Sequence, residues 1–583
     1  MSTLALLKAA DSLHSVGSLL KFKPKSLAYL LYIKPPADRY RSFQIPKRSG
    51  GLRDILSPAD ELKLLQRRVS QLLQDCISDA NIENAWNDKY VHGFTRDRSI
   101  ISNAELHRNR RFVFNLDLED FFGTINFGRV RGFFLKNRTF QLHPKVATVL
   151  AQIACHNNLL PQGSPCSPVI SNLVGHILDV RLCRLASSTG CTYTRYADDI
   201  TFSTNREPFP AEIGKRTENI ASKWVVGDGV IRAIAETGFR VNSAKTRMQF
   251  RRSRQDVTGL IVNRIVNTKS EYRGTVRVMA HRLFQTGKFE VNDLRRDATG
   301  ALVRAKREGT MNQLRGMLAH IYRVDSSRSV PQTDQQTGGA PIHIHGTSRD
   351  ALYRRFLLFQ EFYCAVEPTI LCEGKTDPVY LRFAIKKRLA AFPQLAVAKN
   401  GGAELRVRLF RYSESHLSEL MGVEGGFGAL CKFIGQYLNS FKSFKTAITA
   451  QPIILVVDHD SGGRAVFNAA RDFNKTIRNF EGEYTWIAAN LYLVCTPFNG
   501  DAESVIEHGF TRATRDVRLN GKTFSPDSDF DTQSHYGKVA FARHVEQNWQ
   551  GIDFTGFDTL LTRLEAVLTA HRAKLVAAGR QTP

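Results

Sequence analysis

Two adjacent aspartates, Asp198 and Asp199, stand between two segments rich in β-forming residues, and they constrain this chain more than any other feature. The run 192–203 (TYTRYADDITFS) predicts a β-hairpin that carries both carboxylates at its tip. Like charges this close repel, and each raises the pKa of the other unless a cation lies between them. A divalent metal ion would supply that cation and would suit phosphoryl or nucleotidyl transfer. The alternative is a solvated turn, because Asp is common in turns.

The size and charge of the chain limit the classes of protein to consider. Its 583 residues exceed what a single hydrophobic core organises, so we expect several domains. The 81 Lys and Arg residues outnumber the 55 Asp and Glu residues and leave a formal net charge of +26. An excess this large indicates a polyanionic partner, nucleic acid first, with solubility alone as the alternative.

The cellular setting follows from cysteines and hydropathy. The nine cysteines include no C-x-x-C pair, which predicts buried thiols in a reducing compartment and neither a zinc site nor disulfides. Lys8 and Asp11 interrupt the apolar residues at the N-terminus, and no uncharged run approaches the ~18 residues of a membrane span. We therefore expect a cytoplasmic protein without a membrane partner.

Three further segments are predicted to join the aspartate hairpin. An apolar strand over 113–118 delivers Asp117 near its end, and the chain turns toward a helix at Phe122. Gln162 and Gly163 lie in a Gly/Pro/Ser turn that opens the next helix, where backbone without a side chain can approach a substrate closely. The third segment is a basic hairpin suited to a triphosphate, and its candidate ligands are Lys47 and Arg53.

The first half of the chain resembles a reverse transcriptase in five ordered motifs. Motifs A to E of that family correspond here to the Asp117 segment, Gln162-Gly163, Tyr196-Ala197-Asp198-Asp199, the stretch from Gly238 to Lys245, and Val257-Thr258-Gly259-Leu260. The resemblance implies a right-hand polymerase of fingers, palm and thumb. It also implies dNTP substrates and two Mg²⁺ ions.

The resemblance further implies a role for each motif residue. Asp117 and Asp198 would bridge the two ions, with Asp199 a weaker or more distant participant. Phe122 corresponds to the aromatic position that excludes a 2′-OH, with a core aromatic as the alternative. Lys245 would protonate pyrophosphate, although an exposed lysine that contacts RNA is an equally open interpretation. The other nucleotide-binding candidates are Lys47, Arg53, Gln162 and Gly163.

Two short signatures narrow the resemblance to the retron reverse transcriptases. Asn103-Ala104-Glu105-Leu106-His107 resembles their N-A-x-x-H signature, and Val257-Thr258-Gly259 resembles their V-T-G signature. Those enzymes bind a structured non-coding RNA and prime from the 2′-OH of a guanosine within it, which gives a branched RNA–DNA product (msDNA). The resemblance therefore implies a cognate non-coding RNA and its reverse-transcribed DNA as partners.

A second group of acids lies in the C-terminal part, where short apolar runs alternate with helical stretches. One predicted strand, 369–372, ends at Glu373, and a second, 452–457, ends at Asp458-His459-Asp460. Carboxylates at the C-terminal ends of parallel strands occupy the edge where open α/β sheets form their sites. Three converging acids again imply bound Mg²⁺.

This C-terminal pattern resembles the Toprim domain of type IA topoisomerases, bacterial primases and nucleases of the old-phage-exclusion group. The resemblance implies acid–base or metal chemistry for Glu373 and Mg²⁺ binding by Asp458 and Asp460. Asp377 and Glu507 resemble acids that hold a second metal in the nuclease branch, with ordinary surface acids as the alternative. Lys538 is a weaker candidate for stabilising a transition state, and the 85-residue gap before Asp458 predicts inserted elements and disfavours a topoisomerase or primase.

The predicted fold class is therefore multidomain α+β and α/β, a right-hand polymerase followed by a Toprim-like parallel α/β domain. Between 245 and 308, 16 Lys and Arg residues face 6 Asp and Glu residues on a helix-like background, which favours a thumb that grips RNA. We predict fingers and palm over 1–250, a basic thumb over 251–325, a linker over 326–350 and a Toprim-like effector domain over 351–583.

Together the halves resemble retrons whose reverse transcriptase is fused to a Toprim domain. That resemblance implies a ribonucleoprotein in antiphage defence, with the fused domain as a Mg²⁺-dependent nuclease that is restrained until infection. One alternative is a group II intron-like or diversity-generating reverse transcriptase with a Toprim domain that processes its DNA. Another is a C-terminal domain that is only a non-catalytic scaffold, and a homo-oligomer is left open.

Overall fold

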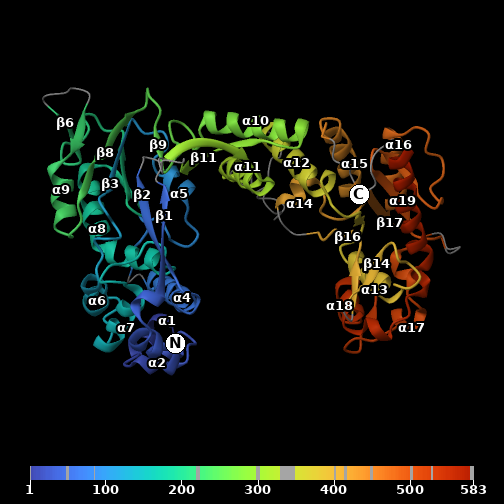
Figure 1. The fold of residues 1–583 in the computed structure, drawn as a ribbon, viewed down its shortest axis with the longest axis horizontal. Helices are drawn as coiled ribbons and strands as arrows, with labels where there is room; N and C mark the ends of the chain where they lie inside the picture. Colours follow the sequence, from blue (N-terminus) through green and yellow to red (C-terminus); the bar gives the residue numbers. More distant parts are fainter. Residues whose placement is uncertain are drawn as a thin grey trace. The chain divides into compact units, whose positions relative to one another are not determined.

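The computed structural model describes residues 2–46, 51–83, 86–217, 223–296, 302–327, 348–399, 402–412, 416–446, 451–498, 503–526 and 530–577. Most of the predicted linker, 326–350, lies outside these residues. The chain divides into two compact units (Figure 1). Unit 1 comprises Met1–Arg273, Leu294–Ala305 and Arg323–Val330, and unit 2 comprises Gly274–Asp293, Lys306–Tyr322 and Pro331–Pro583.

The centre of unit 1 is a four-stranded antiparallel sheet in the order β4-β5-β3-β8. Strand β3 is the apolar segment FVFNLDL, and it is buried along almost its whole length because both of its edges are paired. Helices on this sheet complete one large hydrophobic core. The strands are β3 (Phe112–Leu118), β4 (Thr192–Tyr196), β5 (Asp199–Thr204) and β8 (Val241–Phe250).

The helices of unit 1 bury apolar stripes against that core. The long helix Asp60–Ile82 keeps one buried stripe to its end, where Cys76 and Ala80 are both fully buried. The chain before residue 35 holds three short helices and a π-helical turn. The helices are α1 (Thr3–Ala9), α2 (Leu13–Leu19), α3 (Pro24–Ala28), α4 (Asp60–Ile82), α6 (Phe127–Lys136), α7 (Pro144–Ala154), α8 (Ser167–Thr189) and α9 (Asp228–Ala235).

A β-hairpin forms the predicted basic element of the fingers. Strands β1 (Tyr40–Pro46) and β2 (Leu52–Pro58) pair antiparallel, with Ile45 opposite Arg53. The candidate ligand Lys47 lies outside the described residues, between these strands. A second small pair, β6 (Gly214–Arg216) and β7 (Trp224–Val226), lies near α9 in the sequence.

The two retron-like signatures pack together. Helix α5 (Ile100–Glu105) carries the first signature, and the second forms the turn between β9 (Asp256–Val257) and β10 (Leu260–Ile261). Thr258 and Gly259 both have positive φ angles, of 47° and 86°, and the Thr258 hydroxyl donates to the Ile100 carbonyl at 3.2 Å. The buried His107 imidazole bonds to Ser203 and Thr194, each at 2.7 Å, which fixes α5 against the strands that carry the aspartate hairpin.

The basic stretch 245–308 is less helical than predicted. It contains the end of β8, helix α10 (Ser270–Thr286) and a hairpin of β11 (Glu290–Arg296) and β12 (Leu302–Glu308). Within LVRAKRE, apolar and charged residues alternate only over the four residues 303–306, which is compatible with a short strand. The predicted thumb, 251–325, contributes residues to both units, and its boundaries remain predictions.

Unit 2 contains a five-stranded sheet in the order β16-β13-β17-β19-β18. The first four strands run parallel, and β18 pairs antiparallel at one edge. Every residue of β17 is buried, as expected of a central strand with helices on both faces. The strands are β13 (Thr369–Cys372), β16 (Arg408–Leu409), β17 (Ile453–Val457), β18 (Thr485–Ala488) and β19 (Leu491–Cys495).

The long gap between the two acidic strand ends holds inserted elements, as the spacing predicted. These are α13 (Asp377–Lys387), the hairpin of β14 (Ala396–Lys399) and β15 (Gly402–Leu405), strand β16, and helices α14 (His416–Met421) and α15 (Phe427–Phe441). The other elements of this part of the chain are α11 (Met311–Ser326), α12 (Ser348–Leu358), α16 (Ser461–Phe473), α17 (Arg512–Arg515), β20 (Thr523–Phe524), β21 (His535–Tyr536), α18 (Lys538–Asn548) and α19 (Asp558–Ala577).

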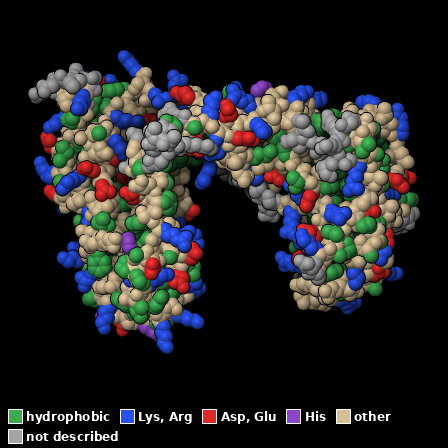
Figure 2. All heavy atoms as spheres, viewed as in Figure 1, with side chains coloured by type: hydrophobic (Ala, Val, Ile, Leu, Met, Phe, Trp, Pro, Cys, Tyr) green, Lys and Arg blue, Asp and Glu red, His purple; other side chains and the backbone are tan. Residues whose placement is uncertain are grey.

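The surface matches the basic composition. Figure 2 shows Lys and Arg side chains spread over the visible face of both units, with fewer Asp and Glu side chains among them. Within the described residues, no helix combines the length and the apolar character needed to cross a lipid bilayer.

Candidate active sites

The aspartate hairpin has the predicted form. Tyr196 pairs with Asp199 in the register of β4 and β5, so Ala197 and Asp198 form a two-residue turn. On the neighbouring strand, Asp117 lies directly opposite Asp199. The Leu118 amide donates to the Asp198 carbonyl at 3.0 Å, which ties the turn to the end of β3. Residues about 80 positions apart in the sequence therefore form one acidic group.

The electrostatics of this group reflect crowding. Asp117 is only 5% exposed. Burial, and then the charge of Asp117, raise the pKa of Asp198 above its usual range. Burial and the charges of both neighbours raise the pKa of Asp199 to about 6.

Lys245, on β8, supplies a positive charge to this group. Its Nζ donates to Asp117 Oδ2 at 2.8 Å, and this hydrogen bond raises the pKa of the lysine. The side chain is 55% exposed, so it can move toward a substrate without crossing a packed core. One lysine against three carboxylates leaves the group negative, which favours the binding of further cations.

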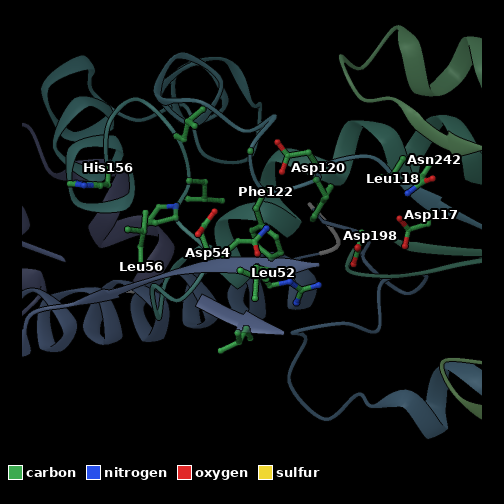
Figure 3. Close-up of a pocket in the computed structure, with 18 of the residues that line it drawn as sticks. Leu52, Asp54, Leu56, Asp117, Leu118, Asp120, Phe122, His156, Asp198 and Asn242 are labelled. Carbon is green, nitrogen blue, oxygen red and sulfur yellow. The ribbon is translucent and has the colours of Figure 1, made fainter. Parts of the chain in front are cut away.

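A cleft of about 1280 Å³ opens beside these residues (Figure 3). It exceeds the roughly 300–1,000 Å³ of typical small-molecule sites, so it can admit a nucleotide together with part of a longer substrate. Figure 3 shows Asp117 and Asp198 close together at one end, with Phe122 further along the cleft. The predicted site residues that line the cleft are Arg53, Asp117, Phe122, Gln162, Asp198 and Lys245.

The loop that carries Gln162 and Gly163 is fastened to the fingers hairpin. The Leu56 amide of β2 donates to the Gln162 carbonyl at 2.8 Å. Gly163 has a φ angle of +118°, and a Cβ atom there would lie 2.6 Å from the Leu56 carbonyl oxygen. Only glycine allows both this backbone conformation and this close approach.

The C-terminal acids converge at the predicted sheet edge. Glu373 follows β13 directly, and Asp458 follows the adjacent parallel strand β17, with the Asp458 amide 3.5 Å from Glu373 Oε2. Asp460 caps α16 by accepting from the Gly463 amide at 2.8 Å. A Cβ atom on Gly462 would lie 2.9 Å from Glu373 Oε1 and 3.3 Å from Asp460 Oδ1, so both carboxylates flank the same glycine.

The weaker candidates lie in the same place. Asp377, only 4% exposed, accepts from the Gly374 amide at 2.8 Å. Glu507, 1% exposed, forms an ion pair with Lys538 Nζ at 3.1 Å. The Ile506 amide donates to Asp458 Oδ1 at 2.8 Å and so joins the Glu507 segment to the end of β17. Asp377 and Glu507 are thus buried, and the surface-acid alternative is wrong for both.

Burial raises the carboxyl pKa values of this second group further than those of the first. Burial and neighbouring carboxylates raise the pKa of Asp458 to about 8, with Asp377, Glu507 and Glu373 contributing in that order. Burial and Asp460 raise the pKa of Glu373 to about 7, and burial and Glu507 raise the pKa of Asp377 to about 6. A cation at this edge would relieve the repulsion.

Both groups fit magnesium by the chemistry of their donors. Mg²⁺ in nucleotide-processing sites is usually held by one or two carboxylates and by substrate phosphates, and rarely by a cage built of protein alone. Within the described ranges, no three His, Cys, Asp or Glu side chains are arranged to hold a metal ion by themselves. A bound Mg²⁺ would need further oxygen ligands, such as waters or substrate phosphates.

A buried ion pair behind the aspartate turn was not predicted from the sequence. Arg195, on β4, and Asp179, on α8, pair with Nε–Oδ1 at 2.6 Å and Nη2–Oδ2 at 2.7 Å. The sequence does hold one sign of this pair, an arginine inside a strand of otherwise uncharged residues. Arginine is almost never fully buried without a partner, so an acidic partner could have been expected.

Comparison with known proteins identifies the family of the N-terminal part of the chain. A family model described as "Reverse transcriptase (RNA-dependent DNA polymerase)" matches residues 45–273. The Retron Ec86 reverse transcriptase of Escherichia coli is 31% identical over 293 residues, which cover 50% of this chain and 83% of that protein. The C-terminal acids lie beyond the end of the family match.

Two relatives from Myxococcus xanthus are matched less completely. The Retron Mx65 reverse transcriptase is 36% identical over 267 residues, which cover 43% of this chain and 58% of the relative. The Retron Mx162 reverse transcriptase is 32% identical over 336 residues, which cover 54% of this chain and 65% of the relative.

Proposed function

The chain belongs to the retron reverse transcriptases, and on that premise we propose that it is an RNA-directed DNA polymerase that copies a structured non-coding RNA. Priming from an internal 2′-OH of that RNA would give a branched RNA–DNA product. The observation that carries the polymerase proposal is the register that sets Asp117 opposite Asp199, at the wall of a cleft large enough for a nucleotide and template.

The proposed chemistry assigns a task to each side chain of the cleft. Asp117 and Asp198 would hold Mg²⁺, which would supply Lewis-acid activation of the attacking hydroxyl and charge neutralisation for the leaving pyrophosphate. Arg53 binds the triphosphate, and Lys245 holds a proton at Nζ for the leaving group. Phe122 occupies the space that a 2′-OH would need, which favours dNTPs over rNTPs.

The polymerase proposal is tested by RNA-templated incorporation of dNTPs. The double variant Asp198→Ala with Asp199→Ala should abolish DNA synthesis, while its affinity for the non-coding RNA should stay within about twofold because phosphate contacts dominate such binding. Extension of DNA by the double variant at the wild-type rate would refute the assignment.

The branched product is tested on nucleic acid that co-purifies with the protein. A short DNA that stays linked to RNA until a 2′,5′-debranching enzyme is added would support priming from a 2′-OH. A linear cDNA with a free 5′ end would instead favour the second candidate, a group II intron-like or diversity-generating enzyme.

For unit 2 we propose a Toprim-like, Mg²⁺-dependent nuclease that acts as the effector of an antiphage system. The support is the convergence of Glu373, Asp458 and Asp460 at the ends of two adjacent parallel strands. Glu373→Ala should remove nuclease activity, toxicity and phage protection and leave DNA synthesis unchanged. Full phage protection by Glu373→Ala would favour a non-catalytic scaffold.

A further inference from the structure

The arginine before the aspartate turn is completely enclosed. Arg195 has no exposed surface, and Asp179 meets its guanidinium in the two-point geometry that suits a carboxylate best. The hydroxyl of Tyr193 also donates to Asp179 Oδ1, at 2.7 Å. A Cβ atom on Gly175 would lie only 3.1 Å from Arg195 Nη2, so α8 leaves just enough room for the guanidinium.

The remaining donor of this guanidinium points at the turn itself. Arg195 Nη1 donates to the Ala197 carbonyl at 3.0 Å and lies 3.3 Å from the side-chain oxygen of Asn172. The Asn172 amide donates in turn to the Gly93 carbonyl at 2.7 Å. The network therefore runs from α8 to the residue immediately before Asp198.

Ala197 has a backbone conformation that needs such support. Its φ angle is +57°, in the left-handed region, which costs a non-glycine residue about 1–2 kcal/mol. Strained residues of this kind persist only where the surroundings over-determine them. Gly93 packs against the other side of the turn, where a Cβ atom would lie 2.6 Å from the Ala197 nitrogen.

We propose that Arg195, anchored by Asp179, is a positioning residue that holds Ala197 in its left-handed conformation and so keeps Asp198 aligned with Asp117. This inference rests on the proposed polymerase function. Arg195 is fully buried and is not among the residues that line the cleft, so it acts through the residues that it contacts, chiefly the turn and also Phe121, whose ring centroid lies 5.7 Å from the guanidinium. Misplacement of a reacting group by about 1 Å can cost roughly 10²-fold in rate.

The test uses three variants of the full chain, with rates expressed per titrated active site. Arg195→Lys keeps the charge and loses the planar fork that reaches Asp179 and Ala197 together. We expect its kcat for dNTP incorporation to fall about 10- to 100-fold, with the KM for dNTP within about threefold. Adding Ala197→Gly to Arg195→Lys should restore a large part of kcat, because glycine adopts this conformation without strain.

A matched control separates positioning from stability. Asp256 is similarly buried and pairs with Arg247 and Lys269, at 2.9 and 3.0 Å, without contacting the turn. Asp256→Asn should lower Tm and leave kcat per active site within about threefold. If Arg195→Lys keeps the wild-type kcat, or if Ala197→Gly does not restore the kcat of Arg195→Lys, the positioning role of Arg195 is wrong and the polymerase function still stands. If the wild-type protein incorporates no dNTP, both the polymerase function and the positioning role are wrong.

Discussion

The two acidic groups of this chain differ in how they hold their carboxylates. In unit 1, the group borders an open cleft, and the lysine beside it, Lys245, is 55% exposed. In unit 2, Asp377 and Glu507 are almost completely buried, and their lysine, Lys538, is 34% exposed. The unit 2 group therefore contains two almost fully buried carboxylates against one, Asp117, in unit 1, and its lysine is the less exposed of the two.

This difference predicts how each group responds to metal and substrate. The open group can exchange its lysine for substrate phosphates on every turnover, as a polymerase must. In unit 2, burial and neighbouring carboxylates raise the pKa of Asp458 to about 8 and that of Glu373 to about 7, so a cation that binds these carboxylates near neutral pH must displace protons from them. Unit 2 should therefore bind metal with a much stronger pH dependence than unit 1.

The largest loss of activity that would test the unit 1 site is expected when Asp117 is replaced. Removing one electrostatic group of an active site typically costs about 10²–10³-fold in rate, so Asp117→Asn should lower dNTP incorporation at least that far. Exposed Glu119, in the turn that directly follows β3, offers a control carboxylate, and Glu119→Gln should stay near wild type. Equal losses in both variants would contradict the assigned site.

The second effect concerns Gly163. Gly163→Ala introduces a Cβ atom 2.6 Å from the Leu56 carbonyl oxygen at a φ angle of +118°, which should cost about 1–3 kcal/mol and at least tenfold in incorporation rate. Gly132, on α6, has open space around its Cβ position, so Gly132→Ala should be neutral or slightly stabilising. Thermal unfolding measures the stability of both variants, and primer extension measures their incorporation rates. If Gly163→Ala changes neither quantity, the close contact between the Gln162–Gly163 loop and the fingers hairpin is wrong.

The third effect compares the two lysines. Lys538→Met leaves the buried Glu507 carboxylate without its ion-pair partner, which should destabilise the protein by about 1–3 kcal/mol. Lys245→Met also leaves a buried carboxylate, Asp117, without its partner, but the lysine that is removed is itself 55% exposed, so the loss should be smaller, about 1 kcal/mol. Urea unfolding would show this order, and the reverse order would contradict the distinction between buried and open groups.

The smallest effect is a pH dependence of stability in unit 2. Asp458 and Glu373 keep protons in the folded state that the unfolded chain has already released, so stability should fall as pH rises from about 4 to about 8. Mg²⁺ should offset that loss at the upper end. Asp458→Asn should flatten the profile by on the order of 1 kcal/mol, measured by calorimetry with and without Mg²⁺. Stability that rises over this range in metal-free buffer would contradict the raised pKa values.

Sequence patterns predicted the elements with strong local signals. The β-rich flanks of Asp198 and Asp199 predicted their hairpin, and the retron resemblance is confirmed by the relatives. The catalytic roles and the Toprim resemblance stay predictions. The pattern did not predict the Arg195–Asp179 pair, because a strand and a helix meet there through tertiary packing that no local period encodes. The helix-like background expected for much of 245–308 is confirmed for α10 and does not extend to β11 and β12.

The most direct measurement records DNA synthesis and Mg²⁺-dependent nuclease activity on the same preparations of wild type, Asp117→Asn and Glu373→Ala. Two separate acidic sites predict that Asp117→Asn loses only synthesis and that Glu373→Ala loses only nuclease activity. Loss of both activities in either variant, with RNA binding and unfolding temperature unchanged, would contradict two independent sites.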